Sequence, residues 1–293
     1  MAGPLRGLPR SWLFVPADSP RKLEKALVSG ADALLIDLED SVAPDAKPRA
    51  REMARDFLRS ARHGPALYVR INALDSGLAD ADLDMVMPAA PAGVMLPKCC
   101  GGRDVQHLGA KLAVREAEND LADGGTRMIA LATETAASVF QLATYAGASR
   151  RLAALTWGAE DLSAELGAAA TRLPDGAYTP PYALARSLTL FGAVAADIAP
   201  IDTVFPAYRD AAGFRRDCEA AARDGFTGKM AIHPDQVGVI NAIFTPSPEA
   251  VARARAIVAA FEAAPAAGVI GVDGQMLDRP HLKRAQKLLA RLG

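Results

Sequence analysis

Short apolar segments alternate along this chain with segments that have the periodicity of amphipathic helices. Eight of these apolar runs occur, at residues 12–15, 33–38, 67–71, 93–96, 128–132, 153–157, 202–205 and 229–232. They lack strict alternation of polar and apolar residues, which is typical of parallel strands that are covered on both faces. Alternating strands and helices predict a parallel α/β sheet, and eight units match a (β/α)8 TIM barrel better than an open sheet.

The chain departs from this regular repeat at two places. The connection after the sixth run, residues 162–200, is long and rich in turn residues, so we expect an extra loop over the barrel mouth. A Thr-Pro-Ser-Pro sequence ends the repeat, and a helical segment, a hairpin at 267–278 and a basic helix follow. We therefore predict a barrel domain at residues 1–245, which would carry any catalytic site, and a C-terminal lid or arm at 246–293.

Charge and hydropathy exclude several classes of protein. The 33 Lys and Arg balance 34 Asp and Glu, so a nucleic-acid protein that depends on a global basic field is not expected. The longest uncharged apolar stretch, residues 188–196, is much shorter than the ~20 residues that cross a bilayer. The first ten residues contain no apolar run of signal-peptide length. The three cysteines give no disulfide framework. Together with the absence of a spanning or signal-like apolar segment, this leads us to expect a cytoplasmic protein without a membrane partner.

Charged or polar side chains directly follow most of the predicted strands. They are Asp37, Glu39, Arg70, Asn72, Lys98, Glu134, Asp161 and His233. Active sites of (β/α)8 barrels lie at the carboxyl ends of the strands. A charge in that position is costly to bury unless it is paired or bound to a metal, so the pattern predicts a functional site. His233 by itself is more typical of a structural hydrogen-bonding residue than of a metal ligand.

Two of these carboxylates, Glu134 and Asp161, end consecutive strands. Neighbouring strands lie ~4.8 Å apart, so both side chains can reach one ion. Oxygen ligands without His or Cys favour Mg²⁺, which keeps positions open for substrate oxygens. Spacing alone leaves a second interpretation equally open, in which the carboxylates pair with Arg70 and Lys98 in a structural layer of ion pairs.

Six short motifs, in order along the chain, resemble the citrate lyase β-subunit and malyl-CoA lyase family of the HpcH/HpaI aldolase superfamily. They are RSWLFVP at 10–16, DLEDSV at 37–42, VRIN at 69–72, LPK at 96–98, GAEDL at 158–162 and GKMAIHP at 228–234. The sequence DGQMLDRP at 273–280 is similar to the C-terminal segment of the longer members, the malyl-, β-methylmalyl- and citramalyl-CoA lyases. Ser19 departs from the arginine of some malyl-CoA lyases, and residues 204–208 are less polar than in many relatives, which leaves the substrate open.

The resemblance implies a Mg²⁺-dependent barrel enzyme that cleaves or forms a C–C bond next to a coenzyme A thioester. Its motifs place the Mg²⁺ ligands at Glu134 and Asp161 and a substrate-binding arginine at Arg70. The expected reaction is retro-Claisen cleavage of a short 3-hydroxyacyl-CoA, of the citramalyl-CoA or malyl-CoA type, to acetyl-CoA and a 2-oxo acid. Asp37 and Glu39 are both candidates for the base that takes the hydroxyl proton, or for groups that orient the site.

The resemblance also indicates which residues meet the rest of the substrate. Phe14 and Lys25 fall where family members contact coenzyme A, and Arg10 is a weaker candidate. Backbone N–H groups at Gly158 and Ala159, just before a predicted helix, are candidates to hold the substrate carboxylate.

The C-terminal segment carries its own expectation. Asp278 matches an acidic residue that the longer members supply from a neighbouring subunit's lid, where it would protonate the enolate of acetyl-CoA. The family usually forms trimers or hexamers, so we expect a homo-oligomer in which the 246–293 arm packs on a neighbour.

Four other functions remain open on the sequence. Two are related enzymes: a citrate lyase β-subunit working on a carrier-protein thioester within a complex, and a pyruvate-type Mg²⁺ aldolase that uses free aldehydes. A thioesterase side activity on malyl-CoA is a third. The fourth is a non-catalytic barrel that binds acyl-CoA, since a fold alone does not establish an activity.

Overall fold

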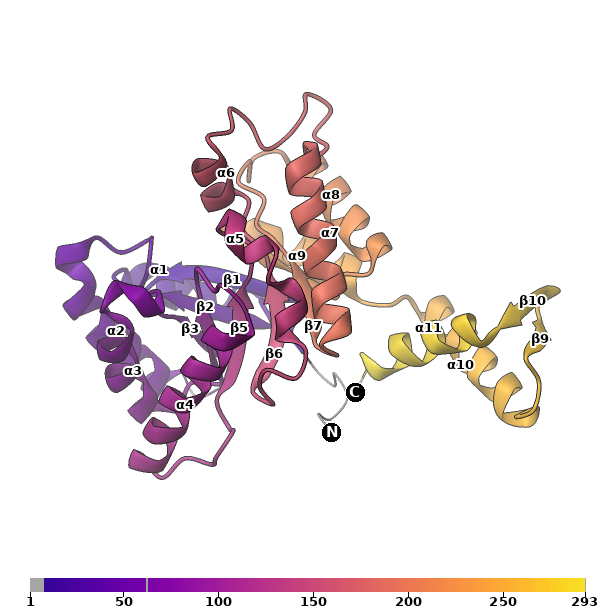
Figure 1. Cartoon of the computed structure of the whole chain (residues 1–293), viewed down its shortest axis with the longest axis horizontal. Helices are drawn as coiled ribbons and strands as arrows, with labels where there is room; N and C mark the ends of the chain where they lie inside the picture. The colour runs from indigo at the N-terminus through magenta and orange to yellow at the C-terminus, as the bar shows by residue number, and fades with distance from the viewer. Residues whose placement is uncertain (1–7, 62, 293) are drawn as a thin grey trace. The chain divides into compact units, whose positions relative to one another are not determined.

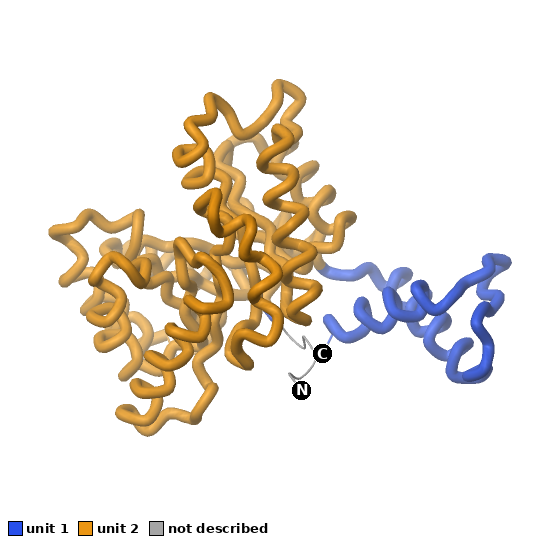
Figure 2. Tube along the Cα trace, in the orientation of Figure 1, with its two compact units in different colours: residues 1–8, 245–293 blue, residues 9–244 orange. Residues whose placement is uncertain are grey.

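The computed structural model describes residues 8–61 and 63–292, which form two compact units (Figures 1 and 2). One unit spans Pro9–Phe244. The other contains Leu8 and residues 245–292 of the described chain. Their division into a barrel domain and a lid domain remains a prediction.

The larger unit is a closed barrel of parallel strands that pair in chain order, with helices around it (Figure 1). The strands are β1 (Ser11–Pro16), β2 (Ala33–Asp37), β3 (Ala66–Arg70), β4 (Gly93–Leu96), β5 (Arg127–Leu131), β6 (Leu152–Thr156), β7 (Ala199–Asp202) and β8 (Gly228–Ala231). The helices are α1 (Pro20–Leu27), α2 (Lys47–Ser60), α3 (Ala79–Val86), α4 (Gly102–Glu118), α5 (Ala136–Val139), α6 (Glu160–Leu166), α7 (Pro180–Ala195), α8 (Ala211–Asp224) and α9 (Pro234–Phe244). The predicted (β/α)8 TIM barrel is confirmed.

The strands alternate between a face toward the barrel interior and a face toward the helices, with a period of two. On β1, Trp12 shares its face with Phe14 and Pro16, which line the cavity at the carboxyl end of the barrel. Trp12 is fully buried and packs edge-on against Tyr68 of β3, with ring centroids 4.9 Å apart. These two rings therefore occupy part of the barrel interior, on the same strand faces as the cavity-lining Phe14 and Arg70.

The seventh strand begins three residues earlier than the apolar pattern predicts, at Ala199 in place of residue 202. The difference arises at Pro200, which lacks a backbone N–H and is tolerated near the start of a strand. Residues 203–205 consequently lie beyond the strand, where Thr203 and Val204 contribute to the cavity wall.

A buried ion-pair network holds the outer side of the last three strands. The Lys229 ammonium of β8 is fully buried, 2.8 Å from carboxylate oxygens of both Asp202 and Asp217. Asp202 also accepts a hydrogen bond of 2.8 Å from the indole N–H of Trp157. Asp217 of α8 pairs with Arg172, in the long segment between α6 and α7, so the extra loop is held by the same network.

The smaller unit is a helix, a hairpin and a second helix, as predicted. It comprises α10 (Pro248–Ala263), the antiparallel strands β9 (Val269–Val272) and β10 (Gln275–Asp278), and α11 (Arg279–Ala290). Its core includes Ile257, Phe261, Ile270 and Leu277, which are almost fully buried. Among the described residues, no helix combines the length and apolar character needed to cross a membrane.

Candidate active site

A cavity of about 450 Å³ opens at the carboxyl ends of the barrel strands. Its volume is in the range of small-molecule sites. The polar lining comes from Asp37, Asp40, Ser41, Arg70, Glu134, Thr156, Glu160, Asp161 and Thr203. Phe14, Leu131, Gly158, Ala159, Val204, Met230 and Ile232 contribute to the rest. Four of the eight charged or polar residues that the sequence places at the strand ends thus line a single cavity: Asp37, Arg70, Glu134 and Asp161.

Arg70, the last residue of β3, is held in a fixed orientation by carboxylates from β2 and the loop after it. Its guanidinium donates two hydrogen bonds of 2.7 Å to the two carboxylate oxygens of Asp37. A third nitrogen lies 2.9 Å from Glu39 Oε2, and the guanidinium carbon stacks 5.0 Å from the centre of the Phe14 ring. Two parallel N–H···O bonds fix the plane of the arginine as well as its position.

Asp37 is fully occupied as a hydrogen-bond acceptor. Besides the two bonds from Arg70, it accepts bonds from the backbone N–H groups of Glu39 (2.9 Å) and Ser41 (3.2 Å). Burial by itself would raise the pKa of Asp37, but the bonds and the charge of Arg70 outweigh it and hold the pKa below its usual value. Because Asp37 has a low pKa and already accepts four hydrogen bonds, it is better suited to orient Arg70 than to act as a base.

Glu39 differs from Asp37 in its electrostatics. It is 5% exposed, and one of its carboxylate oxygens lies 2.5 Å from the Lys98 ammonium. Burial raises its pKa above the usual value, and the charges of Arg70 and Lys98 only partly oppose this. Of the two candidate bases, Glu39 therefore has the higher affinity for a proton.

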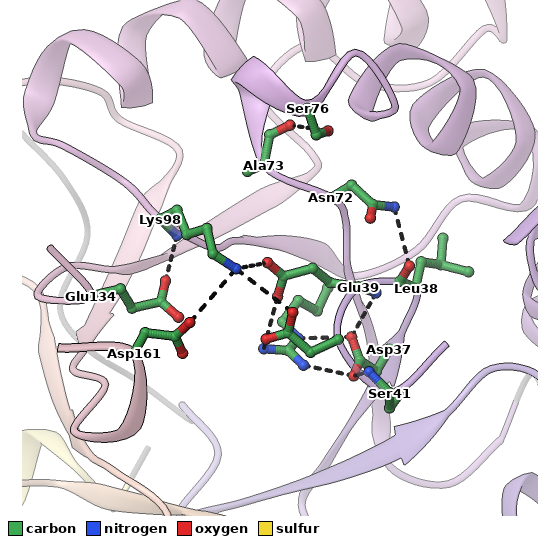
Figure 3. Close-up of polar contacts among 12 residues, drawn as sticks. Asp37, Leu38, Glu39, Ser41, Asn72, Ala73, Ser76, Lys98, Glu134 and Asp161 are labelled. Atoms are coloured by element: carbon green, nitrogen blue, oxygen red, sulfur yellow. Dashed lines mark hydrogen bonds and ion pairs between the residues drawn. The ribbon is translucent and has the colours of Figure 1, made fainter. Parts of the chain in front are cut away.

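Lys98, just after β4, links this arginine cluster to the other carboxylates of the cavity. Figure 3 shows its side chain directed toward Glu39 and Asp161, and its Nζ lies 3.9 Å from Asp161 Oδ1. Its backbone N–H donates a short hydrogen bond to Glu134 Oε2. Lys98 has a φ of +50°, a left-handed conformation that is uncommon for a residue with a side chain. Strained backbone of this kind is often found at functional sites.

Glu134 is buried, and within the described ranges no cationic side chain forms an ion pair with it. It is 3% exposed, and burial raises its pKa to about 8, reinforced by the charges of Asp161 and Glu39. Gly158 makes room for it, since a Cβ at this glycine would lie 2.9 Å from Glu134 Cγ. A buried carboxyl group with this environment needs either a proton or a cation to compensate its charge.

The residues present fit a Mg²⁺ ion. Glu134 and Asp161 both line the cavity, and both offer oxygen ligands. In the described part of the chain, no group of three or more His, Cys, Asp or Glu side chains is gathered as a complete metal site. Two carboxylates match the usual mode of Mg²⁺ binding, in which substrate oxygens and water supply the other ligands.

A second layer of buried polar groups supports the segment that carries Asp37 and Glu39. Lys47 Nζ donates to the backbone carbonyls of Leu38 (2.8 Å) and Glu39 (2.9 Å). Asn72 Nδ2 also donates to the carbonyl of Leu38 and is itself held by Asp82, which pairs with Arg51. Of these residues, only Asn72 stands out in the sequence, because it follows β3 directly. The other three lie on helices, where a charged residue on the buried face gives no distinctive pattern.

Three predicted residues of the larger unit, Arg10, Lys25 and His233, do not line the cavity. Arg10 lies at the amino end of β1, the opposite end of the barrel, where it makes a bidentate ion pair with Asp32. Lys25 is exposed on α1. Asp278 belongs to the smaller unit, where the His281 ring lies 2.5 Å from its carboxylate and keeps its pKa below the usual value. His233 stacks on Tyr208, with ring centroids 4.8 Å apart.

Comparison with known proteins identifies the family. Residues 10–234 match the model of the family described as HpcH/HpaI aldolase/citrate lyase. The chain is 34% identical over 285 residues to the citrate lyase subunit beta of Leuconostoc mesenteroides subsp. cremoris, covering 96% of this chain and 92% of that protein. It is also 34% identical over 300 residues to an L-malyl-CoA/beta-methylmalyl-CoA lyase of Cereibacter sphaeroides, covering 96% and 93%.

A solved structure agrees with both sequence matches. The protein CitE from Mycobacterium tuberculosis, in complex with magnesium, acetoacetate and coenzyme A, superimposes with a TM-score of 0.77 at 34% identity. The match covers 97% of each chain. These matches extend over the barrel and the C-terminal unit, and the resemblance found in the sequence motifs is confirmed. The chain belongs to the HpcH/HpaI aldolase/citrate lyase family.

Proposed function

We propose that this chain is a Mg²⁺-dependent carbon–carbon lyase that cleaves a short 3-hydroxyacyl-CoA thioester, of the citramalyl-CoA or malyl-CoA type, to acetyl-CoA and a 2-oxo acid. One observation carries the proposal. Two carboxylates from the segments that follow β5 and β6, Glu134 and Asp161, line the same cavity as the oriented guanidinium of Arg70. The relatives named above, a citrate lyase subunit and a malyl-CoA lyase, support the same reaction class.

The residues divide the reaction between them. A Mg²⁺ ion held by Glu134 and Asp161 would act as a Lewis acid on oxygens of the substrate. Arg70 is permanently charged and is directed by Asp37, so it stabilises negative charge that develops on the substrate hydroxyl oxygen. Glu39 is the more basic of the two candidate proton acceptors for that hydroxyl, because burial raises its pKa while Asp37 already accepts four hydrogen bonds. Loss of the proton forms the carbonyl of the oxo acid, and the electrons of the broken C–C bond form the enolate of acetyl-CoA.

The enolate needs an acid, and we assign this role to Asp278 from the arm of a neighbouring subunit. In the described unit its pKa is lowered by His281, so it must lose that contact or enter a drier environment before it can donate a proton. Phe14 lines the cavity and Lys25 is exposed on α1, so these are our candidates for contact with the coenzyme, Lys25 with a phosphate. A homotrimer or hexamer in the cytoplasm is part of the same proposal.

The Asp278→Asn variant tests the lid role. We expect a loss of turnover of about 10²-fold, within the range for removal of a general acid, with Mg²⁺ and 2-oxo acid binding unchanged. Asp273→Asn in the same hairpin is the matched control and should keep full activity, since Asn tolerates the left-handed backbone there (φ +50°). Turnover is measured by acetyl-CoA release, and binding by calorimetry. Loss of Mg²⁺ binding in Asp278→Asn would contradict a role confined to protonation.

Product analysis tests the proposed function as a whole. Citramalyl-CoA, malyl-CoA and citryl-CoA are each incubated with the enzyme in Mg²⁺ or in EDTA, and both acetyl-CoA and the oxo acid are followed. We expect Mg²⁺-dependent cleavage of one thioester, with pyruvate or glyoxylate naming the substrate. Oxaloacetate from citryl-CoA would instead favour the citrate lyase β-subunit reaction, and free coenzyme A without an oxo acid would indicate a thioesterase. Cleavage of none of the three would reject the lyase proposal in favour of a free-aldehyde aldolase or a binding protein.

A further inference from the structure

One buried hydroxyl group in the cavity has no hydrogen-bond partner among the described residues. Thr156, the last residue of β6, lines the cavity and is 1% exposed. Its backbone carbonyl accepts a ladder hydrogen bond of 2.9 Å from Ala132, but its Oγ1 atom makes no hydrogen bond. Leaving a buried hydroxyl unsatisfied is unfavourable, because the group loses its bonds to water and gains none in the protein.

Two buried carboxylates at this end of the barrel, by contrast, have partners in the protein. Asp37 takes four donors, and Glu39 Oε2 lies 2.9 Å from Arg70. Thr156 also precedes by only a few residues the chain segment that supplies Gly158 and Asp161 to the same cavity. An unpartnered donor deep in the site, on the strand that leads to a Mg²⁺ ligand, is placed to meet the part of the substrate that the metal holds.

We propose that the Thr156 hydroxyl donates a hydrogen bond to the carboxylate of the 2-oxo acid half of the substrate, and that this half has a small uncharged substituent. The inference rests on the proposed lyase function and specifies its substrate class. Thr156 would touch the substrate itself, which makes it a specificity-determining residue and not a support for another side chain.

The charge of the cavity carries the second part of the inference. Five carboxylates line it, from Asp37, Asp40, Glu134, Glu160 and Asp161. Among the described lining residues Arg70 is the one cationic side chain, and it is paired with Asp37 and Glu39. The nearby Lys98 ammonium is held by Glu39. A second carboxylate on the oxo acid, as in oxaloacetate, would therefore add a negative charge without a free cation to meet it.

Apolar side chains provide space for the uncharged substituent. Leu131, next to Thr156 in the register of β5 and β6, lines the cavity together with Met230, Val204 and Ile232. A hydrogen atom or a methyl group fits such a wall without loss of hydrogen bonds. The oxo acid expected from this cavity is glyoxylate or pyruvate, and the single hydroxyl of Thr156 orients its carboxylate.

The test compares Thr156→Val, which removes the hydroxyl and keeps the shape, with Thr156→Ser, which keeps the hydroxyl. Binding of pyruvate, glyoxylate and oxaloacetate is measured by calorimetry with saturating Mg²⁺, and cleavage is measured with the thioesters. Thr156→Val should bind pyruvate or glyoxylate about 10–100-fold more weakly, as expected for a hydrogen bond to a charged group, while Thr156→Ser stays within about threefold of wild type. Wild type should bind oxaloacetate more weakly than the preferred acid.

Thermal unfolding separates substrate binding from a structural role. Without ligand, Thr156→Val should melt at the same temperature as wild type or a few degrees higher, about 2–4 °C, because it removes an unsatisfied buried hydroxyl. Thr189→Val is the matched control: Thr189 is fully buried in α7, and its hydroxyl donates to the Ala185 carbonyl at 2.9 Å. That variant should lose some stability and keep wild-type oxo acid binding.

Three results would overturn the inference. If Thr156→Val binds the oxo acid as tightly as wild type, the proposed hydrogen bond to the oxo acid does not form. This holds even if cleavage is slower, because the hydroxyl would then face the coenzyme half of the substrate. If wild type binds oxaloacetate more tightly than pyruvate and glyoxylate, the proposal of an uncharged substituent is wrong. If none of the three acids binds, both the hydrogen bond from Thr156 and the uncharged substituent are rejected. A wild-type protein that binds an oxo acid with Mg²⁺ but cleaves no thioester rejects the lyase function alone, and the binding assay still decides the role of Thr156.

Discussion

Replacing Glu134 by glutamine should abolish Mg²⁺ binding and lower kcat/KM by about 10³-fold or more, since metal assistance contributes several kcal/mol and each 1.36 kcal/mol is a factor of ten. Glutamine keeps the shape of the side chain beside Gly158, so the barrel should remain folded. Mg²⁺ binding is followed by calorimetry and turnover by acetyl-CoA release. Glu52→Gln, an exposed position on α2, makes the same change of charge away from the cavity and should have no effect. Equal turnover in Glu134→Gln and wild type would contradict the assignment of Glu134 as a Mg²⁺ ligand.

The same carboxyl group predicts a pH dependence of metal binding. Burial raises the pKa of Glu134 to about 8, partly opposed by the hydrogen bond from the Lys98 backbone and reinforced by Asp161. A ligand must lose its proton to bind a metal, so Mg²⁺ competes with that proton. Mg²⁺ affinity should therefore rise by about tenfold per pH unit below the pKa and level off above it. Calorimetry in buffers of different ionisation enthalpy should show the release of close to one proton at pH 7.

The raised pKa also fixes the sign of a stability effect in the metal-free protein. Glu134 binds its proton more tightly in the folded state than in the unfolded chain, where its pKa is about 4.3. Stability from this group is thus complete below the unfolded value and is lost as pH rises to about 8. In EDTA, the Tm of wild type should fall relative to that of Glu134→Gln between pH 5 and pH 8. A constant difference in Tm over this range would contradict the raised pKa.

The barrel and the two metal-ligand candidates were predictable from sequence for the same physical reason. Strands covered on both faces of a parallel sheet read as apolar runs, so a charge directly after such a run stands out. Glu134 and Asp161 follow consecutive runs, and closure of the barrel brings their strand ends to one cavity. The seventh strand was misplaced because Pro200 resembled the end of a loop.

The partners of each charge were not predictable. Spacing left open whether Arg70 and Lys98 pair with Glu134 and Asp161, and the structure answers differently for the two cations. Arg70 is paired with Asp37 and Glu39. The Lys98 ammonium pairs with Glu39 and lies 3.9 Å from Asp161, whereas Glu134 is met by the backbone N–H of Lys98. Such choices depend on side-chain direction in three dimensions. The free hydroxyl of Thr156 is a further case, because a threonine at the end of a strand has no distinctive sequence pattern.

Arg10 shows the opposite limitation. The resemblance offers it as a weak coenzyme contact because it opens a motif shared with the family, yet it lies at the amino end of β1. There it binds Asp32 through its Nε (2.7 Å) and Nη2 (2.8 Å). A motif carries residues for folding together with residues for chemistry, and only their position along the strand separates the two.

Replacing Arg70 by lysine should lower kcat/KM by about 10²–10³-fold, the loss typical for a group that stabilises charge in the transition state. Lysine keeps the positive charge but has no planar fork, so it cannot bind both oxygens of Asp37 and stack on Phe14 at once. Arg10→Lys is the matched control, because it breaks the same bidentate geometry at the other end of the barrel. Arg10→Lys should lower the stability of the fold and leave kcat/KM unchanged. If Arg10→Lys lowered kcat/KM as much as Arg70→Lys does, the loss at Arg70 would reflect weakened folding and not a role in the transition state.

Asp37→Asn then separates orientation from proton transfer. If Asp37 only holds Arg70, the amide still accepts one hydrogen bond, and activity should fall by about 10–100-fold, as for other residues that orient an active-site group. The acidic limb of the pH–rate profile should persist, because it would belong to Glu39, whose pKa is raised by burial. Glu39→Gln, in contrast, should remove that limb along with most of the activity. Loss of the limb in Asp37→Asn and its survival in Glu39→Gln would exchange the two roles, since the group whose titration limits the rate is the one that takes the proton.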